Sequence, residues 1–291
     1  MTEDSPLLAL RLSVDYRNKP SVLRDLSLDV QPGEIVGLVG QSGSGKSTLA
    51  LAILNLLHLK GGNIRGHVIF KGKDLLPLGE RQLRSLRGRG ISIVLQSPLT
   101  SLNPALRIGA QLKEAWHAHA DGSGDDCLKT IQTALSSVSL PNDKEFLCRR
   151  PSQLSVGQAQ RVIIAMAILH RPSLLIADEA TSALDVITQS EILNLFVRLN
   201  LELNMAILFI SHDLLSVAAL CHRIAILNAG EIVECGPPSQ IFGAPRHAYT
   251  RRLVSALPRV PRFGSRSEQS SDTDSSEEHI EPALGRGLGR L

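Results

Sequence analysis

The chain has 291 residues, the length of one large domain or of a domain with a subdomain. Its net charge of +3 and its aromatic content of 3% provide neither a strongly basic surface nor many stacking rings, so we expect no nucleic-acid partner. No apolar run approaches the ~18 residues that a membrane-spanning helix needs, so we expect no such helix.

The chain begins with MTEDSP, which is acidic and polar and does not resemble a signal peptide, so we expect the protein in the cytosol or on the cytosolic face of a membrane. The first half of the chain is then predicted to contain several strands and one helix. Strands are predicted where apolar residues alternate with polar ones or run together, and a helix follows a glycine-rich loop. The predicted strands are 7–16, 22–30, 35–39, 68–70 and 91–95, and the predicted helix is 46–57, before a break at 61–62.

The second half begins with a helical pattern from about 104 to 170, interrupted by a polar loop at 121–126. Strands then alternate with helical stretches, which predicts a parallel sheet with crossover helices and therefore an α/β fold. Residues 259–291 are rich in serine, arginine, glycine and acids, which predicts a disordered low-complexity tail. The predicted strands of this half are 174–177, 206–210, 223–227 and 231–235.

The cysteines are scattered and show no C-x-x-C spacing, which predicts reduced thiols and not a disulfide or metal framework. They are Cys127, Cys148, Cys221 and Cys235.

A phosphate-binding loop follows the predicted strand 35–39, because Gly40 to Ser47 fits the pattern G-x-x-x-x-G-K-[ST]. Glycines let backbone N–H groups curl around phosphates, and the next helix directs its positive end at them. Lys46 is expected to reach the outer phosphates, and Ser47 to ligate Mg²⁺. The residues expected to hold the nucleotide here are Gly40, Gln41, Ser42, Gly43, Ser44, Gly45, Lys46, Ser47 and Thr48.

Two carboxylates end the apolar strand that starts at Leu174. Asp178 would lie beside the phosphate loop and hold Mg²⁺ through water, and Glu179 would polarise the attacking water. An Asp-Glu pair after a strand can instead merely cap a helix. Gln96 and His212 follow neighbouring strands and should emerge at the same sheet edge, where Gln96 can touch Mg²⁺ or the water and His212 the γ-phosphate.

These motifs, in this order, closely resemble those of the ATP-binding subunits of ABC transporters, and the resemblance covers about residues 8–257. It implies a P-loop NTPase fold, an ABC-type nucleotide-binding domain with an antiparallel β subdomain and an inserted α-helical subdomain at about 104–170. The ABC ATPase domain is then expected to span 7–258.

The resemblance also implies a role for each motif. Glu179 becomes the catalytic base, Gln96 the Q-loop glutamine and His212 the H-loop histidine. Tyr16 matches the aromatic residue that stacks on adenine, and a plain strand tyrosine is the alternative. The signature motif LSVGQ and the D-loop supply the residues expected to contact a nucleotide from the other side: Ser155, Gly157, Gln158 and Asp185.

In this family two ATPase domains face each other head to tail, so that the signature of one contacts the γ-phosphate held by the other. This chain carries one set of motifs, which implies a second ABC ATPase subunit, identical or related.

Finer features resemble the dipeptide, oligopeptide and nickel importer ATPases, notably the SLNP stretch at 101–104 and the ALDV stretch at 183–186. Three positions depart from the usual pattern. Val156 replaces a glycine, and because valine disfavours positive φ we expect an ordinary backbone there. Ala180 and the alanine after His247 each replace a proline. No cysteine follows Cys235, so we expect no iron–sulfur cluster of the kind found in many peptide-importer ATPases.

The resemblance implies an ABC importer subunit that uses Mg·ATP and drives uptake of peptides or a related solute such as nickel or an opine. Its implied partners are two membrane-spanning permease subunits and, indirectly, an extracytoplasmic solute-binding protein. Its implied place is the cytoplasmic face of the cell inner membrane, as a peripheral protein. The alternative is an ABC ATPase of a soluble non-transport complex, such as a phosphonate-breakdown assembly.

Overall fold

The structure is a computed structural model that describes residues 5–17 and 19–257. The elements below belong to a compact unit that ends at residue 256. The predicted disordered tail at 259–291 lies outside the described residues.

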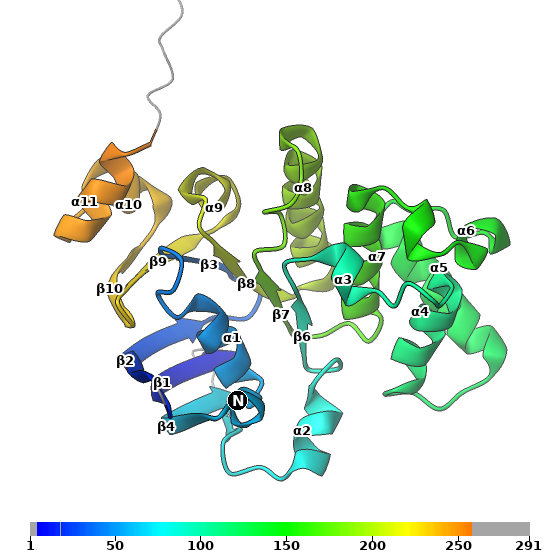
Figure 1. Cartoon of the computed structure of the whole chain (residues 1–291), viewed down its shortest axis with the longest axis horizontal. Helices are drawn as coiled ribbons and strands as arrows, with labels where there is room; N and C mark the ends of the chain where they lie inside the picture. Colours follow the sequence, from blue (N-terminus) through cyan, green and yellow to red (C-terminus); the bar gives the residue numbers. More distant parts are fainter. Residues whose placement is uncertain (1–4, 18, 258–291) are drawn as a thin grey trace, which may run out of the picture. The chain divides into compact units, whose positions relative to one another are not determined.

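A four-stranded antiparallel sheet is built from the N-terminal part of the chain, with the order β2-β1-β4-β5 (Figure 1). Alternate side chains of β1, from Leu8 to Val14, are buried, as expected for a strand with one face on a core. The strands are β1 (Leu8–Tyr16), β2 (Lys19–Val30), β4 (Gly62–Phe70) and β5 (Lys73–Asp74).

A second sheet has six strands in the order β10-β9-β3-β8-β7-β6. All neighbours in it pair in parallel except β10, which runs antiparallel to β9 at the edge. Every residue of β3, β7 and β8 is buried, which matches their continuous apolar sequences. The strands are β3 (Ile35–Val39), β6 (Ile91–Val94), β7 (Leu174–Asp178), β8 (Ala206–Ser211), β9 (Arg223–Asn228) and β10 (Glu231–Gly236).

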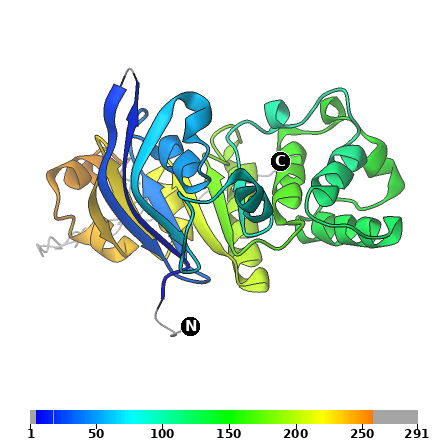
Figure 2. The ribbon, with the colours of Figure 1, turned by 90° about the horizontal axis from the view of Figure 1, so that it is seen from below.

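Only helices lie between β6 and β7, and Figures 1 and 2 show them, in green, beside the β6 edge and away from the antiparallel sheet. They are α3 (Pro98–Ser101), α4 (Ile108–His117), α5 (Gly124–Ser137), α6 (Lys144–Cys148), the short η2 (Pro151–Gln153) and α7 (Val156–Ile168). The other helices are α1 (Lys46–Ile53), η1 (Leu57–Lys60), α2 (Glu80–Leu86), α8 (Val186–Leu203), α9 (Leu214–Leu220), α10 (Pro238–Gly243) and α11 (Ala248–Ser255).

Three predicted boundaries are wrong for local reasons. The loop expected at 121–126 ends at Ser123, because Ser123 and Asp126 form a reciprocal capping box that starts α5. The helix expected at 46–57 ends at Ile53, and the Arg87 side chain binds carbonyl groups just beyond that end. The strand expected at 68–70 begins at Gly62, because β4 pairs along the whole of β1, from Gly62 opposite Tyr16 to Phe70 opposite Leu8.

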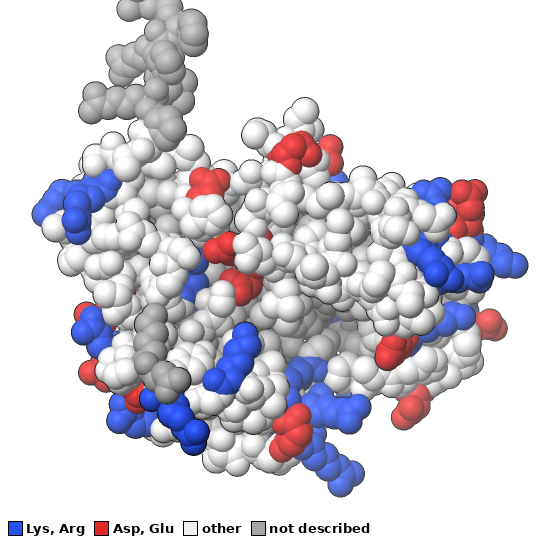
Figure 3. Space-filling view, in the orientation of Figure 1, with Lys and Arg blue, Asp and Glu red and all other residues white. Residues whose placement is uncertain are grey.

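The distribution of surface charge and the state of the cysteines are those of an ordinary globular chain. Basic and acidic side chains are interspersed on the face shown in Figure 3. All four cysteines are free. None of the helices that the structure describes has the length and apolar character needed to cross a bilayer.

Candidate active site

The phosphate-binding loop connects the buried strand β3 to helix α1. Gly43 and Gly45 have φ values of 77° and 110°, in the region that favours glycine. A side chain on Gly40 would place its Cβ 2.4 Å from the Leu227 carbonyl oxygen, and one on Gly45 would lie 2.5 Å from Leu23 Cδ2. The loop can therefore keep this curvature only with glycine at these positions.

Lys46 lies inside this loop with its side chain almost fully buried. Its Nζ donates hydrogen bonds to the Gly40 and Gln41 carbonyl oxygens, at 2.8 and 3.1 Å, and lies 3.8 Å from Glu179 Oε1. Burial lowers the pKa of Lys46, and the charges of Glu179 and Asp178 partly offset that effect. An anion bound in the loop would favour the charged amine.

Asp178 ends β7 as a buried carboxylate. Burial raises its pKa, while a hydrogen bond with Ser47 and the charge of Lys46 act in the opposite direction. Within the described part of the chain its Oδ1 atom has no hydrogen-bond partner, which is costly for a buried polar atom. A carboxylate and a hydroxyl are the oxygen donors that Mg²⁺ prefers, so Asp178 and Ser47 fit a magnesium ion in chemistry and in place.

Glu179 follows directly but has a different environment. Its φ of 50° lies in the left-handed region, which a non-glycine residue occupies only at a cost, and its N–H donates to the Ile210 carbonyl oxygen at 2.9 Å. One carboxylate oxygen faces Lys46, and the other lies 3.6 Å from Nδ1 of His212. The strained backbone thus accompanies a carboxylate held between a buried cation and an exposed imidazole.

Lys46, Ser47 and Glu179 line a cavity of about 460 Å³. Tyr16 lies at one side, with its hydroxyl 3.5 Å from Thr48 Oγ1, and Gln96 reaches the cavity from the end of β6. Val22 also lines it, and no sequence pattern distinguishes this valine from an ordinary strand residue. The cavity is lined by Tyr16, Val22, Ser42, Gly43, Gly45, Lys46, Ser47, Thr48, Gln96 and Glu179.

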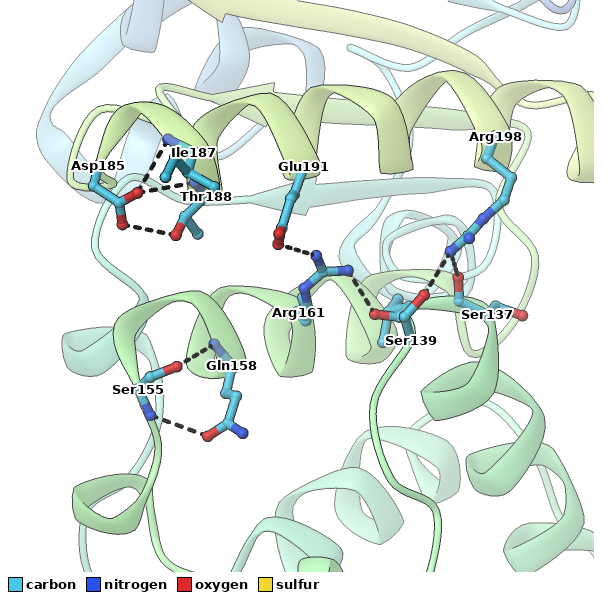
Figure 4. Close-up of polar contacts among 11 residues, drawn as sticks. Ser137, Ser139, Ser155, Gln158, Arg161, Asp185, Ile187, Thr188, Glu191 and Arg198 are labelled. Atoms are coloured by element: carbon cyan, nitrogen blue, oxygen red, sulfur yellow. Dashed lines mark hydrogen bonds and ion pairs between the residues drawn. The ribbon is translucent and has the colours of Figure 1, made fainter.

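The signature segment begins helix α7 (Figure 4). Ser155 is the N-cap: its Oγ accepts from the Gln158 N–H at 3.2 Å, and Gln158 Oε1 accepts from the Ser155 N–H at 3.1 Å. Val156 is the first helical residue and does not have positive φ, as expected for valine. A Cβ on Gly157 would lie 2.8 Å from Thr188 Cγ2, so glycine permits the close approach of α7 and α8.

Asp185 begins helix α8 in the same way. Its Oδ1 accepts from the N–H groups of Ile187 and Thr188, at 3.1 and 3.0 Å, and its Oδ2 accepts from the Thr188 hydroxyl at 2.7 Å. These bonds lower the pKa of Asp185. Figure 4 shows this cap and the Ser155 cap close together at the starts of two adjacent helices.

The predicted site residues therefore fall into two groups. The phosphate loop, Tyr16, Gln96 and Glu179 contribute to one cavity, Asp178 lies buried beside it, and His212 contacts Glu179. Among the described residues that line the cavity there is none from the second group, which consists of Ser155, Gly157, Gln158 and Asp185. One chain thus presents two separate sets of polar groups.

Comparisons with known proteins agree on the family. The family model described as ABC transporter matches residues 23–182. The dipeptide transport ATP-binding protein DppD of Escherichia coli is 42% identical over 251 residues, which cover 85% of this chain and 77% of that protein. The oligopeptide transport ATP-binding protein OppD of Bacillus subtilis is 39% identical, with 86% and 70% covered. The glutathione import protein GsiA of Escherichia coli is 40% identical, but this chain spans only 40% of its length.

Solved structures show the same fold. The protein cbiO1 of Clostridium perfringens, part of the ABC transporter complex cbiONQ, superposes with a TM-score of 0.73 at 25% identity, covering 88% of this chain and 97% of that one. A dimeric ATP-binding cassette bound to ADP and phosphate gives 0.68 at 27% identity, covering 79% and 98%. This chain belongs to the ABC transporter family and is an ATP-binding, ATP-hydrolysing domain of that family.

Proposed function

We propose that the chain is the ATPase subunit of an ABC importer that takes up peptides or a related solute, such as nickel or an opine. Relatives of about 40% identity are named for dipeptide, oligopeptide and glutathione transport. The observation that carries the proposal is the separation of the cavity from the signature helix, because it leaves one chain with two half-sites. Each half-site requires a complementary half from a second ATPase subunit.

ATP would lie in the cavity with its phosphates in the glycine loop. Tyr16 would stack on the adenine, and Lys46 and the backbone N–H groups of 40–48 would bind the phosphates. Ser47, Asp178 and Gln96 would hold Mg²⁺, the last two directly or through water. When bound, Mg²⁺ neutralises phosphate charge and orients the terminal phosphate for attack.

Hydrolysis needs a base on the open side of the terminal phosphate. Glu179 would orient the attacking water and accept its proton, and its position in the cavity lining supports this role. His212 lies 3.6 Å from Glu179 and would contact the γ-phosphate. Lys46, which lies 3.8 Å from Glu179, would stabilise the negative charge that develops on the phosphate during hydrolysis.

The second set of residues would serve the partner's nucleotide. Ser155, Gly157 and Gln158 surround the N-terminus of α7, where backbone N–H groups and the helix dipole favour an anion. Asp185 would contact the partner at the start of α8. Two ATPase subunits closing on two nucleotides would then move the two permease subunits, with the solute-binding protein acting indirectly from the other side. We place the assembly at the cytoplasmic face of the inner membrane.

A pull-down of the tagged chain from gently solubilised native membranes, followed by mass spectrometry, tests this proposal. We expect two multi-span membrane proteins and a second ATPase subunit. Recovery of soluble enzyme subunits alone, with the chain absent from the membrane fraction, would refute the importer and support a phosphonate-type complex.

A further inference from the structure

Three helices begin at or next to residues of the two half-sites, each with a side-chain N-cap. Ser155 caps α7, Asp185 caps α8, and Asp213, the neighbour of His212, caps α9. Helix α8 is bonded to both of the others within two turns of its start. On one side Glu191 pairs with Arg161 of α7, as Figure 4 shows. On the other side Gln189 reaches the start of α9.

The contact of Gln189 with α9 is a small hydrogen-bonded polar cluster. Gln189 Nε2 donates to Asp213 Oδ2 at 3.2 Å and to Ser216 Oγ at 2.6 Å. Ser216 Oγ in turn donates to the same Asp213 oxygen, while Asp213 Oδ1 accepts from the Leu215 N–H at 3.0 Å. Ser216 is buried and Gln189 and Asp213 are half-buried, so water competes little for these bonds.

This cluster fixes the backbone on which His212 is carried. The Asp213 N–H donates to Ser211 Oγ at 3.0 Å, so the residues on both sides of His212 are tied down. The His212 ring itself is 59% exposed, and within the described part of the chain its one polar contact is Glu179. Its position beside Glu179 therefore depends on the backbone turn, and that turn is held from α8 by Gln189.

We propose that Gln189 is a positioning residue for ATP hydrolysis: it holds the Asp213 turn and so keeps His212 beside Glu179. The inference rests on the proposed function, in which His212 contacts the γ-phosphate. Asp185, which would face the partner ATPase, caps the start of α8, and Gln189 lies in the first turn of the same helix. The hydrogen bonds of Gln189 to Asp213 and Ser216 therefore connect the start of α8 with the turn that carries His212. Through these bonds, docking of the partner at the start of α8 would affect the position of His212.

The test is a double-mutant cycle on the full chain, assembled with any ATPase subunit that co-purifies with it, with steady-state hydrolysis measured over a range of Mg·ATP concentrations. The variants are Gln189→Ala, the near-isosteric Gln189→Glu, His212→Ala and the double variant Q189A/H212A. Ser190→Ala is the matched control, since Ser190 is exposed on the same helix. Thermal unfolding of each variant shows that it is folded.

We expect both Gln189 variants to lower kcat by about 5- to 10-fold with KM changed less than about 2-fold, the loss expected for one or two net hydrogen bonds. His212→Ala should lower kcat at least as much, and the double variant should match His212→Ala, because Gln189 acts through His212. Ser190→Ala should match the parent chain.

Two other results overturn the inference in distinguishable ways. In the first, His212→Ala lowers kcat but Gln189→Ala does not, or the fold-losses of the two single variants multiply in the double variant. Gln189 then does not act through His212, and the proposed function stands. If His212→Ala leaves kcat unchanged, the role of His212 in the proposed function fails, and the inference fails with it.

Discussion

Asp178 and Glu179 are adjacent carboxylates with different surroundings. Asp178 is 7% exposed, and burial raises its pKa, whereas Glu179 faces the cavity between Lys46 and His212. The left-handed backbone at Glu179 separates them, because it turns the chain as the strand ends. The two residues can therefore take different roles, one toward a metal ion and one toward water.

Replacing Glu179 with Gln should leave ATP binding intact and lower turnover at least about 100-fold, the usual contribution of a general base. The measurement pairs an ATP-binding titration with the hydrolysis rate. Glu202→Gln, an exposed change near the end of α8, is the control and should match the parent. Undiminished hydrolysis by E179Q would remove Glu179 from the base role.

Asp178→Asn should stabilise the nucleotide-free chain while abolishing hydrolysis. Burial raises the folded-state pKa of Asp178 above that of an ordinary aspartate, so the protonated form is favoured and stability falls as pH rises through the folded pKa. At pH 7.5 the Asp178 carboxylate is charged, and its burial then costs its full desolvation free energy. If the substitution removes about 1 kcal/mol of this cost, Tm should rise by about 2–4 °C. Thermal unfolding should show this gain shrinking toward pH 4. A lower Tm for D178N at pH 7.5 would mean that Lys46 and Ser47 outweigh burial.

The site residues that the sequence singles out most clearly are those whose chemistry needs a fixed spacing. The loop from Gly40 to Ser47 and the pair Asp178-Glu179 are of this kind, and the structure brings them together. Val22 and Gln189 could not be predicted, because their roles depend on packing across the fold. The left-handed φ of Glu179 also has no sequence signal, since glutamate rarely adopts it.

At the scale of elements, helix α7 is joined to α8 and α5 by one arginine. Arg161 donates from Nη1 to the Val138 carbonyl oxygen and from Nη2 to Glu191, both at 2.9 Å. Arg198 makes a similar bridge further along α8, to the Ser137 carbonyl oxygen at 2.6 Å (Figure 4). Helix α7 is thus attached to α8 by the Arg161–Glu191 ion pair, in addition to the close approach at Gly157.

Truncating Arg161 should cost more than the ion pair alone. Arg161→Ala should lower the free energy of unfolding by about 1–2 kcal/mol, because the Val138 carbonyl loses its partner and a mostly buried stem is removed. Glu191→Ala should cost less than about 0.5 kcal/mol, since Glu191 is 57% exposed. Urea unfolding of both single variants and the double variant gives the coupling, expected at about 0.5 kcal/mol or less. If the Arg161–Glu191 coupling free energy were nearly as large as the whole stability loss of Arg161→Ala, the ion pair and not the Val138 contact and the buried stem would account for that loss.

Element types were predictable where apolar patterns were long, and boundaries were not. The alternating and continuous apolar runs gave β1, β3, β7, β8 and β9 within a few residues, because burial on one or both faces determines those sequences. Helix ends depend instead on individual side chains. Ser123 and Asp126 cap the start of α5, and Arg87 binds a carbonyl group beyond the end of α1. Such bonds override local propensity at helix ends.

At the scale of the whole molecule, the parallel order of β6, β7, β8 and β3 carries the argument. Their carboxyl ends lie at one edge of the sheet, so Gln96, Glu179, His212 and the phosphate loop converge there although they are far apart in sequence. The signature helix α7 begins elsewhere, beyond β6. This arrangement leaves one chain with two separate sets of polar groups, as the proposed pairing of two ATPase subunits requires.

The most direct test is the molecular mass of the E179Q chain, measured by sedimentation velocity with and without Mg·ATP, alone and mixed with any ATPase subunit that co-purifies. We predict that ATP converts the E179Q chain to a two-ATPase species, a homodimer or a one-to-one pair, and that Ser155→Tyr in the same background prevents this by blocking the signature. An E179Q chain that is saturated with ATP and still remains monomeric in both preparations would contradict the account.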